Sequence, residues 1–358
     1  MRDLRPPPFR ELPPHPVLGP PPLSEPPSVI IGSSSGGNDS HAAVLYARWR
    51  WPDVPIIIWH ALLDEMDWEQ TPAALDALAD RVGGQRVTVQ AVYQRTGNLT
   101  PTGNHGVTLA AIHDVDANGP ATADHYPDGI RTLLDFAMAA RNGQPPTARI
   151  RWCTHYFKIA LFDAWARRNR TLLGERTLLI TGERWRESPG RERRLTSWEW
   201  RDALTLQSGN AEHPAGWRLL WLRPVIGWVW HQVNAYVHAC GVSFHPGYFA
   251  QGETVESMLD PHRDERQGRA RLSCRCCIFT HPRHLVATLH NDPTAMAPAI
   301  ARVRAYEHAS GFSWQQRGPI DDLVALTPTR RYSQQILLLA EPPFQPNQTE
   351  ANNERNDP

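Results

Sequence analysis

A short apolar run that breaks into a serine- and glycine-rich loop constrains the fold of this chain more than any other stretch. Residues 29–32 indicate a buried strand, residues 33–40 indicate a turn, and residues 41–48 have the composition of a helix. In a strand–loop–helix unit of this kind, the backbone N–H groups at the N-terminus of the helix bind phosphate. Gly36 and Gly37 carry no Cβ atom, so the main chain can approach an anion closely.

The side chains of the same loop favour phosphate chemistry. Ser33, Ser35 and Ser40 can donate hydrogen bonds to phosphate oxygens. Asp39 can cap the helix or hold a metal ion beside the phosphates. The loop lacks the lysine that ends a Walker loop, and it does not follow the Gly-x-Gly-x-x-Gly pattern of dinucleotide-binding loops. A surface turn is the alternative, and the strand before the loop and the helix after it weigh against that interpretation.

Apolar runs alternate with helical segments along most of the chain. Continuous apolar strands separated by helices predict a doubly wound α/β fold, with a mostly parallel sheet and helices on both faces. Further strands are expected at 55–61, 87–93 and 177–182 and within 221–237. Helices are expected at 39–50, 71–83, 128–142, 155–168, 230–239 and 285–310. Residues 95–126, rich in Gly, Asn, Thr and Pro, are expected to form a long loop.

Composition excludes several classes of protein. Basic and acidic residues both number 37, so the net charge is zero. The composition therefore does not indicate a protein whose whole surface binds nucleic acid. No apolar run reaches the length of a membrane span, and the beginning of the sequence lacks the apolar core of a secretory signal. Five cysteines, three of them crowded at Cys274, Cys276 and Cys277, indicate metal binding or redox chemistry rather than a disulfide framework. We expect a cytoplasmic protein that does not contact a membrane.

The chain divides into four parts. Residues 1–27 are a proline-rich arm that we expect to be disordered. Residues 28–240 are expected to form a nucleotide-binding α/β domain, with residues 241–335 as a C-terminal region that contains cysteines and helices and packs on it. Residues 341–358, rich in Asn, Glu and Pro, are expected to be a disordered tail.

Residues outside the loop also suit catalysis. Cys153 directly precedes an expected helix, whose dipole would favour its thiolate, and Lys158 lies off the apolar face of that helix. Arg184 and Arg191 follow a strand end, where α/β sheets bind ligands, and their guanidinium groups suit phosphate or sulfate oxygens. A solvated run of charges is the alternative for these arginines. The tryptophans interleaved with arginines, which would also suit stacking on single-stranded nucleic acid, are Trp185, Trp198 and Trp200.

The loop from Ser35 to Ser40 resembles the PP-loop signature Ser-Gly-Gly-x-Asp-Ser of the ATP pyrophosphatase and PAPS reductase superfamily, the adenine nucleotide alpha-hydrolases. The pattern is most similar to that of the phosphorothioation-type PAPS reductase-like proteins. Other blocks that resemble this superfamily are Arg151 to Lys158, Gly182 to Arg191, Arg223 to Trp228, His245 to Tyr248 and Arg271 to Ile278. Two departures are Gly227, where the family has an acidic residue, and an added polar stretch at 251–268.

The resemblance implies the fold of the adenine nucleotide alpha-hydrolases and a site for ATP or PAPS with Mg²⁺. Its catalytic residues would be Lys158, Arg184, Arg191 and Cys153. Its nucleotide- and phosphate-binding residues would be Ser33, Ser35, Gly36, Gly37, Asn38, Asp39, Ser40, Asp64, Gly182, Glu187 and Ser188. Acidic residues also suit the start of a helix, so Asp64 has a structural alternative.

The resemblance further implies a metal centre. Cys153, Cys274 and Cys277 would hold a [4Fe–4S] cluster. The candidate fourth ligands are Cys276, His281 and His284. Zinc is the competing metal, and a metal-free pair of cysteines is a further alternative.

Three functions are compatible with these residues. The first is an ATP pyrophosphatase that transfers AMP to an acceptor so that sulfur can displace it, with a nucleic acid or a protein as partner. The second is a PAPS or APS reductase, against which weighs the absence of any cysteine after Cys277. The third is a non-catalytic nucleotide-binding subunit of a DNA-modification or defence system. The acceptor, the sulfur donor and the oligomeric state are left open.

Overall fold

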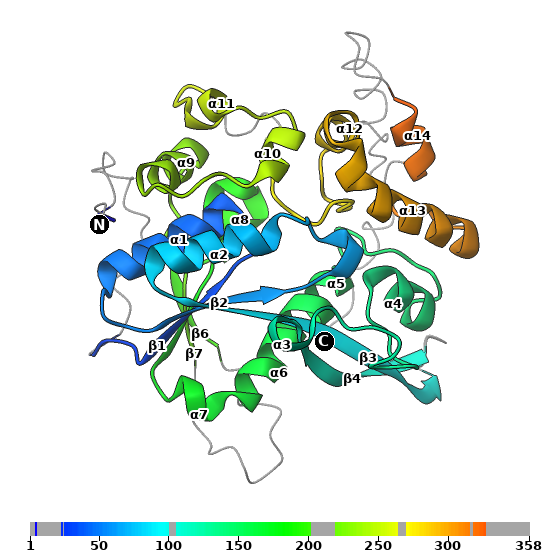
Figure 1. Cartoon of the computed structure of the whole chain (residues 1–358), viewed down its shortest axis with the longest axis horizontal. Helices are drawn as coiled ribbons and strands as arrows, with labels where there is room; N and C mark the ends of the chain where they lie inside the picture. Colours follow the sequence, from blue (N-terminus) through cyan, green and yellow to red (C-terminus); the bar gives the residue numbers. More distant parts are fainter. Residues whose placement is uncertain are drawn as a thin grey trace, which may run out of the picture.

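A seven-stranded, mostly parallel sheet forms the centre of the protein (Figure 1). The computed structural model describes residues 4–5, 23, 25–99, 105–201, 219–263, 270–315 and 318–326. In the order in which they lie in the sheet, the strands are β4 (His105–Asp114), β3 (Gln85–Leu99), β2 (Ile56–Ala61), β1 (Val29–Ser33), β5 (Thr177–Ile180), β7 (Leu219–Leu222) and β6 (Trp198–Arg201). The five inner strands are parallel, and the two edge strands are antiparallel to their neighbours. The predicted α/β class with a mostly parallel sheet is confirmed.

Both faces of the sheet are buried. In β1, Ile30 belongs to one apolar cluster and Ile31 to the other, because successive side chains of a strand point to opposite faces. The first face is covered by α1 (Asn38–Arg50), α2 (Thr71–Val82) and α9 (Trp230–Ala239). The second is covered by α4 (Leu133–Ala140) and α6 (Leu161–Arg168). The C-terminal helices α12 (Pro282–Asn291), α13 (Pro293–Ser310) and α14 (Ile320–Val324) extend the same apolar cluster, and α13 packs against α4.

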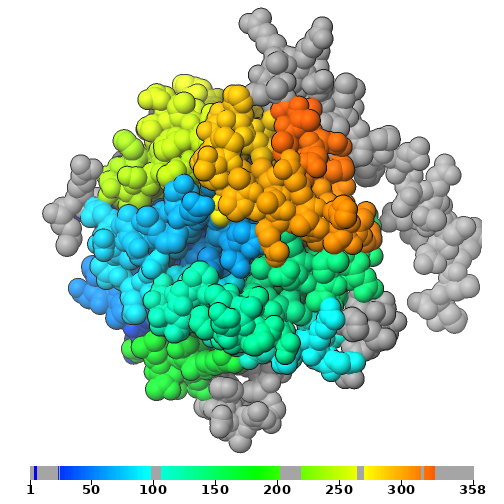
Figure 2. Space-filling view, turned by 45° about the vertical axis from the view of Figure 1, so that its right-hand side comes forward, coloured from blue at the N-terminus to red at the C-terminus, as the bar shows by residue number. Residues whose placement is uncertain are grey.

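The C-terminal helices share a core with the sheet and do not form a separate body. Met296 and Val303 of α13 lie in the same buried cluster as Phe136 of α4. In Figure 2 the light orange residues of α13 lie directly against green residues from the first half of the chain. Two short helices, α10 (Pro246–Ala250) and α11 (Val255–Leu259), lie near α9 (Figure 1).

The prediction of a long loop at 95–126 is wrong. Strand β3 continues to Leu99 and pairs with β4, and α3 (Val115–Asn118) follows. Val107, Leu109 and Ile112 pack against the core from β4. These apolar residues are spaced among Gly, Thr and His, and the bulges in this pair of strands interrupt the alternation from which a strand is recognised.

Other boundaries also differ from the predicted ones. The helix expected at 128–142 is limited to α4, because Thr132 accepts a hydrogen bond from the Asp135 amide and starts the helix there. The helix expected at 155–168 begins earlier, with α5 (Trp152–Thr154), and contains a π-helical segment, His155–Ala160, before α6. The edge strand β6 was not predicted.

Most of the expected arm at 1–27 and all of the expected tail at 341–358 lie outside the described residues. Within the arm, the carbonyl of Leu4 accepts a hydrogen bond from Tyr236 Oη at 2.7 Å. No helix among the described residues has both the length and the apolar character needed to cross a bilayer.

Candidate functional site

A cavity of about 1250 Å³ opens at the carboxyl ends of β1, β2 and β5. The chain leaves β1 towards β2 on one side and later returns to β5 on the other, so the loop after β1 lies where the strand order reverses. Open α/β sheets bind ligands at such a point. The predicted site residues that line this cavity are Ser33, Ser35, Gly37, Asp39, Ser40, Lys158, Gly182, Arg184, Glu187, Ser188, Arg191 and Cys274, together with the candidate metal ligands His281 and His284. Those outside its lining are Gly36, Asn38, Asp64, Cys153, Cys276 and Cys277.

The loop after β1 is closed by its own side chains. Ser34 Oγ lies 2.8 Å from Ser40 Oγ and accepts the Gly36 amide at 3.2 Å. Ser40 Oγ donates to the Gly37 carbonyl at 2.7 Å. Gly36 has φ +81°, a left-handed conformation that a side chain would strain. These contacts hold the loop in a curl before α1 begins.

Alternate amides of this curl lack a partner within the part of the chain that the structure describes. The N–H groups of Ser35, Gly37 and Asp39 donate to no described residue, whereas the Asn38 amide donates to Tyr248 Oη at 3.0 Å. The Asn38 side chain turns away and donates to Asn234 Oδ1 at 2.8 Å. Three unpaired amides at the positive end of a helix are suited to an anion.

Gly182, just after β5, packs directly against the first turn of α1. A Cβ atom at this position would lie 2.2 Å from the Asp39 carbonyl carbon and 2.4 Å from the Ser40 nitrogen. No side chain fits there without a shift of the backbone that forms the anion-binding curl. The close approach explains why a glycine is required at the end of this strand.

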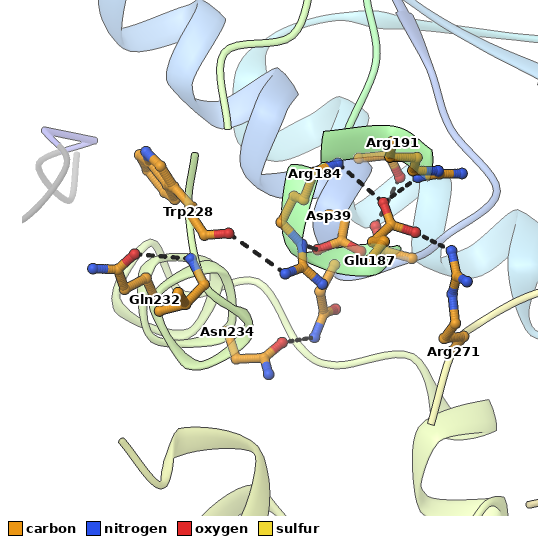
Figure 3. Close-up of polar contacts among 12 residues, drawn as sticks. Asp39, Arg184, Glu187, Arg191, Trp228, Gln232, Asn234 and Arg271 are labelled. Atoms are coloured by element: carbon orange, nitrogen blue, oxygen red, sulfur yellow. Dashed lines mark hydrogen bonds and ion pairs between the residues drawn. The ribbon is translucent and has the colours of Figure 1, made fainter. Parts of the chain in front are cut away.

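Arg184 is already engaged in the site (Figure 3). Its side chain is 3% exposed, and its Nε donates to Asp39 Oδ1 at 2.7 Å. Its Nη1 reaches the Trp228 carbonyl at 3.5 Å. Arg184 therefore joins the first turn of α1 to the segment before α9, and it neutralises Asp39 in doing so.

Glu187 gathers the other arginines at this side of the cavity. Its carboxylate accepts the Arg184 amide at 3.0 Å and forms ion pairs with Arg191 and Arg271 (Figure 3). Ser188 caps the short helix α8 (Pro189–Arg194) by accepting the Arg191 amide at 3.2 Å. Glu187 and Ser188 thus orient the segment that carries Arg191.

Lys158 projects from the π-helical segment into the cavity lining. Its side chain forms no hydrogen bond or ion pair with any residue that the structure describes, although its charge lowers the pKa of Asp67 and of Cys277. It is also the only lysine in the sequence, since the remaining 36 of the 37 basic residues are arginines. The presence of a single lysine among so many arginines is a feature of the sequence that also points to Lys158.

The two cysteines of the Cys-x-x-Cys motif share a hydrogen bond between their thiols. The bond from Cys274 lowers the pKa of Cys277 to about 6, against the effect of burial, and the Phe279 amide and Lys158 contribute to the lowering. The same bond, with burial, raises the pKa of Cys274. The bond and the nearby lysine thus favour a thiolate at Cys277 and a thiol at Cys274.

The surroundings of Cys153 do not favour the predicted thiolate. Burial raises the pKa of Cys153, and the nearby Cys277 adds to this effect. Cys276 is fully buried in the core, and its carbonyl accepts hydrogen bonds from Trp314 and Gln315. Cys153 and Cys277 influence one another electrostatically, so they lie in one region.

The thiols fit a metal centre only in part. Within the described ranges, no three His, Cys, Asp or Glu side chains are arranged to hold a metal ion. Cys274 and Cys277 offer two neighbouring donors, and Cys153 is kept protonated by burial. The iron–sulfur cluster and the zinc ion remain predictions from the resemblance.

The acidic residue that faces the cavity after β2 is Asp67, which sequence reasoning missed. Asp67 accepts a hydrogen bond from His60 Nε2 at 2.8 Å and from the Leu63 amide at 3.3 Å. Asp64 has φ +54° and lies beside Glu65 and Arg302 instead. The two aspartates are three positions apart in one polar run, so the sequence alone does not distinguish them.

Replacing Asp64 by asparagine is expected to stabilise the protein at pH 7. Burial, with Glu65, raises the pKa of Asp64 from 3.8 to about 6. The folded state then binds more protons than the unfolded state between these values, so the free energy of unfolding falls as pH rises from 3.8 to about 6. Because Asp64 keeps some contact with solvent, we expect a gain of about 1 kcal/mol rather than the full linkage value.

Urea unfolding of the Asp64→Asn variant between pH 3.5 and 7.5 tests this expectation. Asparagine tolerates the left-handed backbone, so the substitution adds no strain. Asp80→Asn, on the exposed side of α2, is the matched control and should leave the pH slope unchanged. An unchanged slope in Asp64→Asn would contradict the prediction. If the Asp64→Asn variant lost affinity for nucleotide, Asp64 would instead be a nucleotide-binding residue.

Comparisons with known proteins do not assign the chain to a family. No protein-family model matches the sequence, and no curated protein matches it. The functional assignment therefore depends on the residues of the site and on the resemblance of their motifs.

Proposed function

We propose that this protein is an adenine-nucleotide enzyme of the PP-loop type, with a doubly wound fold, that cleaves ATP between its α- and β-phosphates. The nucleotide phosphates would lie in the curl from Ser35 to Ser40. The observation that carries the proposal is the set of three unpaired amides, Ser35, Gly37 and Asp39, at the N-terminus of α1 beside the cavity. Such amides bind the oxygens of a phosphate chain without a rearrangement of the backbone.

The other charges of the cavity suit the same reaction. Lys158, whose side chain has no hydrogen-bond or ion-pair partner among the described residues, would neutralise charge that develops on the leaving pyrophosphate. Arg184 holds Asp39 and so fixes the first turn of α1 in place. Asp39 and Asp67 are the cavity-lining carboxylates suited to Mg²⁺, which when bound would neutralise phosphate oxygens.

Sulfur transfer is the second half of the proposal. AMP would be placed on an acceptor atom, and a sulfur nucleophile would then displace it. Support comes from the Cys274–Cys277 pair: Cys274 lines the cavity, and its hydrogen bond favours a thiolate at Cys277, which lies outside the lining. A thiolate is the nucleophilic form of cysteine.

A pair of substitutions at Gly37 tests the phosphate loop. Gly37 has φ −78°, which proline adopts, so Gly37→Pro removes the N–H group without requiring a new φ. Gly37→Ala keeps the N–H group, and its Cβ would meet its nearest neighbour, Tyr248 Oη, at 3.5 Å. We expect the proline variant to bind Mg-ATP at least tenfold more weakly than the alanine variant, because a charge-assisted hydrogen bond is lost.

Product analysis then separates the candidate reactions. Release of AMP and pyrophosphate from ATP supports the proposed cleavage, whereas ADP and phosphate would contradict it. Tighter binding of phosphoadenosine phosphosulfate than of ATP would favour the reductase. Binding of ATP without turnover, with candidate acceptors present, would favour a nucleotide-binding subunit. Equal affinity of both Gly37 variants for Mg-ATP would show that the Gly37 amide does not bind the nucleotide.

A further inference from the structure

The cavity is larger than one nucleotide requires. Its volume is about 1250 Å³, whereas pockets for ligands of drug size, a class that includes ATP by mass, hold about 300 to 1,000 Å³. The Ser35–Ser40 curl forms one part of its wall, and Arg191 and Arg271 form another, which adjoins the curl through Glu187 and Arg184. A second reactant therefore has room beside the nucleotide.

Two arginines from distant segments meet on one carboxylate in that second part. Arg191 of α8 and Arg271, from the segment that leads to Cys274, both pair with Glu187 (Figure 3). The Glu187 side chain is 7% exposed, whereas those of Arg191 and Arg271 are 27% and 54% exposed. Two positive charges and one negative charge leave this group with a net charge of +1. Glu187 orients the two guanidinium groups without neutralising both.

The guanidinium groups keep donors for a second anion. Each has five N–H donors in a fixed plane. Glu187 takes the Nη1 group of Arg191 and the Nη2 group of Arg271, and the other side-chain donors of both arginines bond to no residue in the described part of the chain. Planar forks of this kind match the oxygens of a phosphate group.

We propose that Arg191 and Arg271 form a second anion subsite, which binds a phosphate group of the acceptor molecule. This inference rests on the proposed function, since it assigns the space beside the nucleotide to the second substrate. Arg271 precedes Cys274 by three residues, and both line the cavity. A phosphate held there would bring the acceptor alongside the Cys-x-x-Cys pair. The neighbouring Arg186 and Glu192 also line the cavity and carry opposite charges.

The test is calorimetric titration of the full chain saturated with magnesium and a non-hydrolysable α,β-methylene analogue of ATP. The probes are inorganic phosphate and a 5′-phosphorylated ten-residue thymidine oligonucleotide. We expect Arg271→Gln to weaken phosphate binding about tenfold and to change the affinity for the analogue by less than twofold. Arg271→Lys keeps the positive charge but not the planar guanidinium group, so its phosphate affinity should lie between those of the unmodified protein and Arg271→Gln.

Arg304→Gln is the matched control, because Arg304 is 49% exposed and also forms one carboxylate pair, with Asp321. It should bind phosphate as the unmodified protein does. Unchanged phosphate binding in Arg271→Gln, or displacement of phosphate by the ATP analogue, would overturn the proposal. Oligonucleotide binding that depends on Arg271 would support a polymeric acceptor, and binding of inorganic phosphate alone would support a small phosphorylated one.

The same titrations separate this inference from the proposed function. If the protein binds phosphate in an Arg271-dependent way but does not bind the ATP analogue, the nucleotide proposal fails and the anion subsite stands. If it binds the analogue but its phosphate affinity is insensitive to Arg271, the subsite fails and the nucleotide proposal stands.

Discussion

Gly182→Ala is expected to lower the affinity for Mg-ATP by more than a hundredfold. The added Cβ atom would lie 2.2 to 2.4 Å from the backbone of Asp39 and Ser40, far inside van der Waals contact. Because the contacted atoms are backbone, no side-chain rotation relieves the overlap, and the first turn of α1 must move. That turn carries the Asp39 amide and the carboxylate that Arg184 holds. Overpacking of this kind also costs about 1 to 3 kcal/mol of stability.

Gly190→Ala is the control for this experiment. Its Cβ atom would meet its nearest neighbour, a flexible Arg194 nitrogen, at 3.5 Å, so the substitution is expected to leave both affinity and stability nearly unchanged. Calorimetric titration gives the affinity, and urea unfolding shows whether the variant is folded. A folded Gly182→Ala protein that binds Mg-ATP normally would show that this turn does not hold the phosphates.

Lys158→Gln is expected to lower the rate of pyrophosphate release by a factor of about 100 to 1,000, as is typical when one stabilising donor is lost. The free energy of unfolding should change by only about 1 kcal/mol or less, because the Lys158 side chain has no hydrogen bond or ion pair within the described residues and acts on Asp67 and Cys277 only through its charge. Lys158→Arg keeps the positive charge and should retain part of the rate. A Lys158→Gln variant with normal turnover would exclude this residue from the reaction.

The composition of the chain gives an independent measurement of the same residue. Lys158 carries the only side-chain amine in the sequence, so an amine-directed reagent has only Lys158 and the α-amino group to modify. Mg-ATP should protect Lys158 and leave the α-amino group reactive, as peptide mass spectrometry would show. Equal labelling with and without nucleotide would place Lys158 outside the nucleotide site.

The centre of the fold was predictable because its signals are local. The strands β1, β2 and β5 are short and almost entirely apolar, and each is buried on both faces. The pair β3–β4 was less visible, since an edge strand keeps polar residues and this pair contains bulges. Strand β6, with the sequence Trp-Glu-Trp-Arg, was obscured by its charges.

The candidate site was predictable as a set of residues but not as a set of partners. The motifs identified the loop and the residues after β5, and many of these line one cavity. The bond from Arg184 to Asp39 joins residues 145 positions apart, and no local pattern indicates it. The thiolate likewise depends on which thiol donates to the other, so sequence reasoning chose Cys153 where hydrogen bonding favours Cys277.

The hydrogen bond from the Asn38 amide to the Tyr248 hydroxyl affects when the loop can be completed during synthesis of the chain. The two residues are 210 positions apart, so the ribosome must add more than half of the chain after the loop before this tyrosine exists. Domains emerge and begin to fold from the N-terminus. The strand and helix that flank the loop are translated first, yet the back of the loop is completed by one of the later segments. A nascent chain therefore becomes able to bind a ligand at this loop only late, when most of the sheet has already been synthesised.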